Sequence, residues 1–147
     1  MDSFNEFISK HDFWINDYAL FMAFKSIYNN RPWYEWPEEA RHRDKKALIK
    51  ASKDLIDNIN QTLFQQFVFF TQWHEVREYA KKYGIELFGD MPIFVAHDSA
   101  DVWAQRDCFL INADGEMPFV AGVPPDAFSD TGQRWGNPLY NWKNMQG

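Results

Sequence analysis

The long interval from Arg41 to Tyr83 contains neither proline nor glycine, and it constrains the fold of this chain more than any other stretch. Charged residues dominate its beginning, and apolar residues then recur at spacings near three and four. These apolar positions are Leu55, Ile59, Leu63, Phe67, Phe70, Val76 and Tyr79. The periodicity predicts one long helix or two consecutive helices, ended by Gly84. Phe67-Val-Phe-Phe70 has the composition of a strand, but it lies within the helical pattern and is predicted to be helical.

A second helical pattern covers Phe4 to Ile27, with Asp12 as a candidate N-cap. Asn29-Asn30-Arg31-Pro32 ends this pattern. The segment that follows, Pro32-Trp-Tyr-Glu-Trp-Pro37, predicts a rigid aromatic loop. Its simplest interpretation is a loop that packs over the core.

The apolar segment from Ile85 to Ala96 breaks into polar, acidic positions at its end. This pattern is typical of a buried strand that delivers carboxylates to the end of a sheet, so Ile85 to Ala96 is predicted to be a strand. The next residues, Asp98 to Asp101, are predicted to begin a short helix that carries Val102 and Trp103. The simplest roles for the two acids are a helix cap for Asp98 and a first-turn position for Asp101.

A hairpin is predicted around Asn112-Ala-Asp-Gly115, because Asp-Gly lies between the apolar runs Phe109 to Ile111 and Met117 to Val120. After Val120 the chain is rich in turn-forming residues and is predicted to be loop-like. These residues are Gly122, Pro124, Pro125, Gly132, Gly136 and Pro138.

Composition bounds the class of protein. The 147 residues suggest one domain or part of one. Hydrophobic residues make up 46% of the chain and aromatic residues 18%, which is enough apolar material for a core. Most of the aromatic rings are expected in that core. The net charge of −6 argues against a nucleic acid as the main partner. No apolar run approaches the roughly 20 residues of a membrane span, and no secretory signal is apparent, so no membrane partner and a cytoplasmic location are expected.

Cofactor and metal chemistry find little support in the sequence. The single cysteine, Cys108, excludes an internal disulfide, and the four histidines do not cluster with metal-ligand spacing. His97 beside Asp98 is weak evidence for a general base. No glycine-rich phosphate motif is present, and no cofactor is expected.

Four segments together resemble one known family. They are Phe13 to Ala23, Gly89 to Trp103, Val120-Ala-Gly-Val-Pro-Pro-Asp126 and Thr131-Gly-Gln-Arg-Trp-Gly-Asn-Pro-Leu-Tyr140. They resemble the amylomaltases, the 4-α-glucanotransferases or disproportionating enzymes of glycoside hydrolase family 77 in the α-amylase superfamily. The resemblance runs over nearly the whole chain in the right order.

The resemblance implies an α/β fold, a (β/α)₈ TIM barrel with inserted helices. Such a barrel needs about 250 residues, so residues 1–147 are expected to form only part of the catalytic domain. Within that part, 4–83 is expected to be helical and 84–147 to hold a barrel strand and the substrate-loop region. The implied activity is transfer of α-1,4-glucan segments between maltooligosaccharides by a retaining double displacement, without a cofactor.

The resemblance also implies site residues. Those expected to bind substrate are Asp90, Asp126, Phe128, Gln133 and Trp135. On sequence alone Asp90 is a candidate nucleophile, but in the superfamily the first strand-end aspartate shapes the site beside the sugar. No catalytic residue is therefore assigned within the chain, and the catalytic carboxylates are expected downstream. Ala127 stands where relatives commonly carry an aromatic residue, which puts the shielding of an acceptor sugar in question.

Alternative interpretations remain for the chain and for its aromatic residues. The chain is either part of the transferase, a non-catalytic carbohydrate-binding module, or an inactive structural fragment. The Pro32 to Pro37 loop is either core packing or a wall beside a glucan groove, and Trp135 either lines substrate or tethers its loop to the core. As a partial barrel, the chain alone is expected to be inactive and to self-associate.

Overall fold

The computed structural model describes residues 2–145. Their contacts define two compact units, of which the first comprises Met1–Ile27 with Lys50–Met91 and the second Tyr28–Ile49 with Pro92–Gly147. Among the described residues, no helix is long and apolar enough to cross a membrane.

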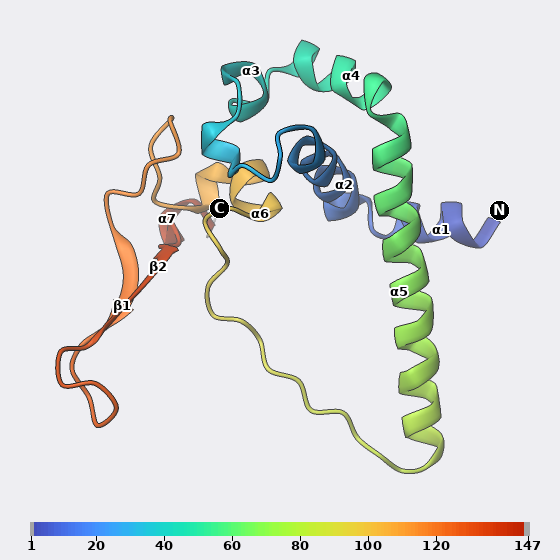
Figure 1. The fold of residues 1–147 in the computed structure, drawn as a ribbon. Coiled ribbons are helices and arrows are strands. Elements are labelled where there is room, and N and C mark those ends of the chain that lie inside the picture. Colours follow the sequence, from blue (N-terminus) through green and yellow to red (C-terminus); the bar gives the residue numbers. More distant parts are fainter. Residues whose placement is uncertain (1, 146–147) are drawn as a thin grey trace. The chain divides into compact units, whose positions relative to one another are not determined.

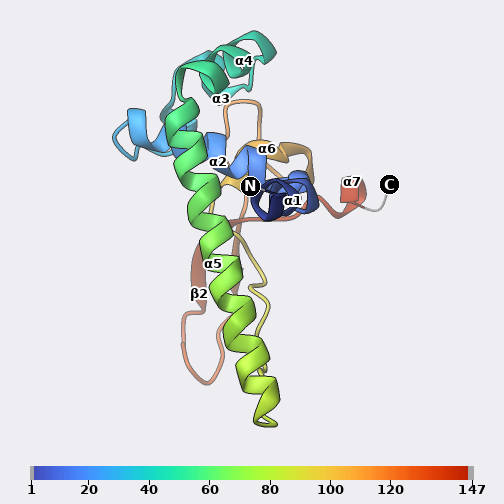
Figure 2. The ribbon, with the colours of Figure 1, turned by 90° about the vertical axis from the view of Figure 1, so that its right-hand side faces the viewer.

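The first unit is helical and centres on one long helix, α5 (Ile56–Lys82). The shorter helices α1 (Asp2–Lys10) and α2 (Asp12–Ile27) both pack against it (Figure 1). Ile15 and Ala19 of α2 are fully buried against Leu63 of α5. The second half of α5 continues past α1 and α2 (Figure 2), and residues 71–79 are all exposed.

The predicted helices within Arg41 to Tyr83 are confirmed as two consecutive helices, α4 (Lys45–Asp54) and α5, which are separated at Leu55. The short helix α3 (Glu38–Arg41) precedes them. The end of α5 at Gly84 is also confirmed. The Gly84 N–H donates to the Lys81 carbonyl at 3.0 Å, and the Ile85 N–H donates to the Ala80 carbonyl at 3.0 Å. These two bonds are those of a Schellman cap, with Gly84 at φ +69°.

The predicted cap at Asp12 is wrong by one residue. Asp12 is the first residue of α2, and the carbonyl of His11 accepts from the Trp14 N–H at 3.2 Å and the Ile15 N–H at 3.0 Å. His11 therefore occupies the cap position, and the Asp12 carboxylate lies in the first turn, where negative charge favours the positive end of the helix.

The strand predicted from Ile85 to Ala96 is not formed. This segment has no strand assignment, and every residue from 81 to 93 is exposed. A strand needs a hydrogen-bonded neighbour, and among the described residues the two strands that exist pair only with each other. The described chain is a mixed helical and β structure without a closed barrel.

The second unit is built around buried tryptophans. Trp33 of the short helix η1 (Trp33–Glu35) and Trp103 of α6 (Ala100–Ala104) are fully buried, and Trp36 is buried beside them. The Nε1–H groups of Trp33, Trp36 and Trp103 donate to backbone carbonyls at 2.7, 3.0 and 3.0 Å. Two of the three rings in the aromatic loop are thus core residues, which confirms its simplest interpretation.

The start of α6 corrects the role of Asp98. Ser99 is the N-cap, and its Oγ accepts from the Val102 N–H at 3.3 Å. The Asp98 Oδ1 instead accepts from the Trp33 N–H at 3.2 Å, which joins α6 to η1. Asp101 lies in the first turn, as predicted.

The hairpin predicted around Asn112 forms only its turn. The Asn112 Oδ1 accepts from the Asp114 N–H at 3.0 Å and the Glu116 N–H at 2.8 Å, so the side chain takes donors at the base of the turn. Its flanks do not pair as strands, because Phe109 bridges to Tyr140. The hairpin that forms is β1 (Val120–Val123) with β2 (Gln133–Pro138). The helices η2 (Arg106–Cys108) and α7 (Trp142–Met145) complete the unit.

Candidate functional site

The β1–β2 hairpin holds four of the five predicted substrate-binding residues, with Asp126 and Phe128 in the loop between the strands and Gln133 and Trp135 in β2. The two strands are antiparallel, with Val123 opposite Gln133 and Val120 opposite Pro138, and they project the loop away from α6 (Figure 1). Residues 124–128 between them are all exposed. The hairpin therefore presents the segment that resembles the family's substrate loop to its surroundings.

Asp126 orders this loop from within. Its Oδ1 accepts from the Phe128 N–H and the Ser129 N–H, both at 2.9 Å, and the Asp126 and Ser129 backbones exchange bonds of 3.0 and 3.3 Å. The Ser129 hydroxyl donates to the Gly132 carbonyl at 2.8 Å. A carboxylate that accepts two backbone donors stabilises a tight turn. The structure places Asp126 as a residue that shapes the loop.

Phe128 and Trp135 give the loop region its exposed rings. The Phe128 side chain is 92% exposed and that of Trp135 is 44% exposed. The Trp135 Nε1–H donates to the Gln133 Oε1 at 3.0 Å, which fixes the indole against the amide and leaves the Gln133 NH₂ group as a donor. An apolar ring beside a polar amide suits a ligand with both apolar faces and hydroxyl groups, such as a sugar.

Phe94 supports the base of the hairpin, a role that sequence reasoning missed. Its ring packs edge-on to Trp135 at 6.0 Å and stacks on Tyr140 at 5.8 Å. The Asn137 side chain donates to the Val95 carbonyl at 2.9 Å. Phe94 and Val95 were predicted to be part of a strand. The only sequence signal for their actual role is that they lie within Gly89 to Trp103, one of the segments that resemble the family. Trp135 thus tethers the hairpin and remains partly exposed, and its role in lining substrate stays a prediction.

Asp90 belongs to the first unit, whereas the other four predicted residues belong to the second. Its side chain is exposed in the irregular segment after α5. The neighbouring Phe88 and Met91 are also exposed, at 103% and 83%. Asp90 and the loop residues are therefore described in separate compact units.

His97 has a structural role that argues against a general base. Its Nε2–H donates to the Gly115 carbonyl at 2.7 Å, and its ring stacks on Tyr34 with centroids 4.4 Å apart. Burial lowers the pKa of His97, and the Gly115 carbonyl and the charge of Asp98 oppose that shift. A neutral, packed imidazole that donates to a carbonyl holds two segments together. Within residues 2–145, no three His, Cys, Asp or Glu side chains gather as metal ligands.

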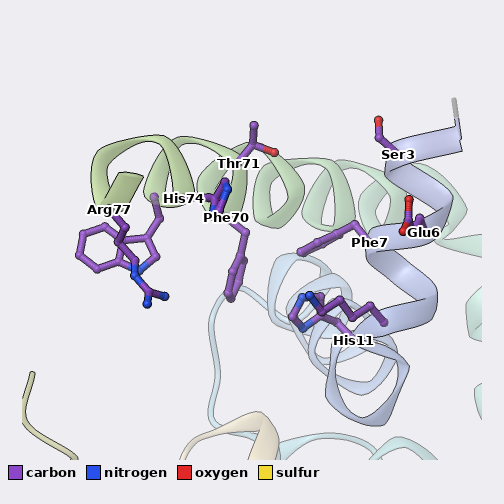
Figure 3. Close-up of a pocket in the computed structure, with 10 residues that line it drawn as sticks. Ser3, Glu6, Phe7, His11, Phe70, Thr71, His74 and Arg77 are labelled. Atoms are coloured by element: carbon purple, nitrogen blue, oxygen red, sulfur yellow. The ribbon is translucent and has the colours of Figure 1, made fainter. Parts of the chain in front are cut away.

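A groove of about 510 Å³ lies in the first unit between α1 and α5 (Figure 3). Phe7 and Phe70 face each other across it with ring centroids 5.5 Å apart, and His11 lies 5.2 Å from Phe70. His74 and Arg77 from α5 line it as well. None of the predicted substrate-binding residues lines this groove, and its rings account for the packing of α1 on α5.

Comparison with known proteins gives a consistent result. The family model described as 4-alpha-glucanotransferase of glycoside hydrolase family 77 matches residues 1–147. A 4-alpha-glucanotransferase of Thermus thermophilus is 48% identical over 145 residues, which cover 99% of this chain and 29% of that protein. The chloroplastic/amyloplastic 4-alpha-glucanotransferase DPE1 of Oryza sativa subsp. japonica is 50% identical over 133 residues, which cover 90% of this chain and 22% of that protein.

Solved structures agree with the sequence relatives. The amylomaltase from Streptococcus agalactiae in complex with acarbose superposes with a TM-score of 0.92 at 38% identity, over 97% of this chain and 29% of that one. The chain thus spans less than a third of the length of these relatives. Because the family model matches the whole chain, this chain belongs to the 4-alpha-glucanotransferase family, glycoside hydrolase family 77.

Proposed function

We propose that this chain is the substrate-loop part of a 4-α-glucanotransferase that transfers α-1,4-glucan segments between maltooligosaccharides. The observation that carries the proposal is the family match over residues 1–147 together with a hairpin loop that presents exposed rings. The similar amylomaltase from Streptococcus agalactiae is in complex with acarbose, which supports a sugar-like ligand.

The proposed roles follow from the loop geometry. Phe128 supplies an exposed ring for the apolar face of a sugar, and Trp135 with Gln133 supplies a second ring edge and an amide donor. Asp126 is a positioning residue, because its Oδ1 holds the backbone of Phe128 and Ser129. Asp90 is proposed to line the pocket beside the bound sugar in the assembled catalytic domain.

The chemistry of the proposed reaction needs more than these residues. A retaining transferase places a carboxylate nucleophile and an acid/base carboxyl group about 5–5.5 Å apart and forms a covalent glycosyl-enzyme. A sugar hydroxyl, rather than water, then attacks the intermediate. We propose that both carboxylates, and the remaining strands of a (β/α)₈ barrel, come from sequence outside residues 1–147. The chain's own contribution is to bind and orient glucan and to exclude water.

The proposal is tested on the full-length protein that carries this sequence. Phe128→Ala removes an exposed ring from the loop, and Phe119→Ala is a matched control, because Phe119 is 66% exposed in the same unit but outside the loop. Fully burying a Phe side chain is worth about 1.5–3 kcal/mol, so Phe128→Ala should lower kcat/KM for maltotriose about tenfold or more. Phe119→Ala should leave it unchanged. Equal kinetics for the two variants would remove Phe128 from the substrate site.

A further inference from the structure

A cavity of about 240 Å³ lies in the second unit, where the turn after α3 meets the segment between α6 and η2. Its walls include Arg43, Trp103, Gln105 and Arg106. The Trp103 Nε1–H donates to the Ala40 carbonyl at 3.0 Å, which joins α6 to α3 beside it. The cavity is too small for an oligosaccharide and large enough for a phosphoryl group with a small substituent.

Positive charge is concentrated around this cavity. Burial lowers the pKa of the Arg106 guanidinium, and the charges of Arg41 and Arg43 lower it further, while Asp114 opposes the shift. The Asp114 carboxylate lies 3.6 Å from the Arg41 Nη2, but its side chain is 65% exposed and its charge is screened by solvent. Asp107 also lines the cavity. The guanidinium groups of Arg43 and Arg106 thus line the cavity with one carboxylate, that of Asp107, and the ion pair of Arg41 with Asp114 lies outside its lining.

The guanidinium planes are held in place by buried rings. The Arg43 guanidinium lies 4.2 Å from the ring of Trp103, and that of Arg106 lies 4.5 Å from the ring of Trp33. Both tryptophans are fully buried. The Arg106 Nη1 also donates to the Ala113 carbonyl at 3.0 Å. Groups fixed in this way lose little freedom when a ligand binds, which favours affinity.

Several donors of this cluster are unsatisfied. Within the described part of the chain, the Nε and Nη2 of Arg106 and the Nε of Arg41 are buried and have no hydrogen-bond partner. Buried N–H groups are normally paired, so each of these atoms needs an explanation. An oxyanion is a multiple acceptor and would satisfy donors of this kind.

The backbone conformation at Arg43 is unusual for a residue with a side chain. Arg43 follows α3 at φ +58°, and the Asp44 N–H donates to the Glu39 carbonyl at 2.8 Å, as in a Schellman cap. Glycine is the usual residue at this position, because a side chain there is strained. The protein carries arginine instead, and the contact of its guanidinium with the Trp103 ring offsets part of the strain.

We propose that this basic cavity binds a small phosphate-bearing anion, either free phosphate or a phosphate monoester. Two arginines in the lining, with Arg41 near them, favour a phosphate dianion over a carboxylate, because phosphate brings more than one negative charge and more acceptor oxygens. This ligand is distinct from the glucan of the proposed function, and the site lies apart from the β1–β2 loop in sequence and in its lining residues.

The test is isothermal titration calorimetry of the full-length protein at constant ionic strength, with inorganic phosphate, glucose 1-phosphate and chloride as separate titrants. Saturable binding of a phosphate titrant and none of chloride is expected. Arg43→Gly should weaken phosphate binding about tenfold, the value of one charged hydrogen bond. It relieves the backbone at φ +58°, so the fold should persist. Arg134→Gln, an equal loss of charge on β2, should leave binding unchanged.

A variant that binds phosphate more tightly distinguishes a ligand-binding site from arginines that only pack against the tryptophan rings. Asp114→Asn removes the carboxylate that competes for the cluster and should tighten phosphate binding a few-fold. Tighter binding of glucose 1-phosphate than of inorganic phosphate would assign the site to an ester, and the reverse order to free phosphate. No saturable phosphate binding in the wild type, or equal affinities in the wild type, Arg43→Gly and Asp114→Asn, would overturn the proposal.

Discussion

Gly115→Ala should destabilise the second unit strongly, because Gly115 lies directly against the buried ring of Trp33. A Cβ at position 115 would lie 2.4 Å from Trp33 Cη2 and 2.8 Å from its Cζ3. Trp33 is fully buried, its Nε1–H donates to the His97 carbonyl at 2.7 Å, and the Arg106 guanidinium lies over its ring. The ring is therefore held on several sides and cannot move aside freely.

The magnitude has two parts. Gly115 has φ +85°, and a residue with a Cβ in the left-handed region costs about 1–2 kcal/mol. Overpacking of a fixed core adds about 1–3 kcal/mol. The expected loss is therefore about 2–5 kcal/mol, a large share of the roughly 5–15 kcal/mol that stabilises a typical domain.

Equilibrium urea unfolding followed by tryptophan fluorescence measures this loss. Gly136→Ala is the matched control, because Gly136 has φ +80° but a Cβ added there would meet nothing within 4 Å. Gly136→Ala should lower the free energy of unfolding only by the cost of a Cβ in the left-handed region, about 1–2 kcal/mol. In a Trp33→Phe background the excess cost of Gly115→Ala should shrink, because phenylalanine lacks the outer indole atoms. If Gly115→Ala costs no more than Gly136→Ala, the contact with Trp33 does not constrain the turn.

Three further predictions concern pH dependence, self-association and the substrate loop. Burial lowers the pKa of His97, so this imidazole binds a proton more readily in the unfolded chain than in the folded one. The free energy of unfolding should therefore be highest above pH 6.5, the ordinary pKa of histidine, and should fall as the pH drops below it. In urea titrations at several pH values, His97→Gln should flatten this dependence. Residues 1–147 alone should self-associate, because large apolar side chains such as Tyr79 and Phe88 are 66% and 103% exposed; sedimentation that shows a monomer at all concentrations would contradict this. In the full-length protein, Ala127→Tyr should raise the ratio of transfer to hydrolysis, because a ring on the exposed loop stacks on an acceptor sugar and excludes water; an unchanged ratio would show that Ala127 does not face the acceptor.

The helices could be predicted from sequence because their signals are local. The spacing of apolar residues in α5, the absence of proline and glycine, and the stop at Gly84 all lie within the element itself. The aromatic loop at Trp33 was likewise predicted to pack over a core. Its particular partners, His97 and Gly115, lie far away in the sequence and could not be read from it.

The β structure was harder to predict because pairing is non-local. Ile85 to Ala96 has the composition of a strand but no neighbour within the described chain, and the Asn112 side chain takes the donors at the base of the predicted hairpin. The helix cap was displaced from Asp98 to Ser99, since both residue types cap helices and the Asp98 carboxylate instead accepts from Trp33.

The candidate site was predicted mainly through family resemblance. The resemblance selected Phe128, Gln133 and Trp135, and the structure shows their exposure and the bond between Trp135 and Gln133. It gave Asp126 a substrate role, which stays a prediction, and the contacts add that this carboxylate forms the turn of the loop. The cluster of Arg41, Arg43 and Arg106 had no sequence signal, because contacts across the fold bring it together.

A maltotriose assay of the full-length protein and of purified residues 1–147, in which glucose and longer maltooligosaccharides are followed over time, tests whether the chain belongs to a catalytic transferase. The full-length protein should produce both and residues 1–147 neither, because the catalytic carboxylates are proposed to lie outside this stretch. Turnover by residues 1–147 after stringent purification would contradict that placement of the carboxylates. Absence of longer products from a folded full-length protein would contradict the proposed transferase activity, and would favour a non-catalytic carbohydrate-binding role.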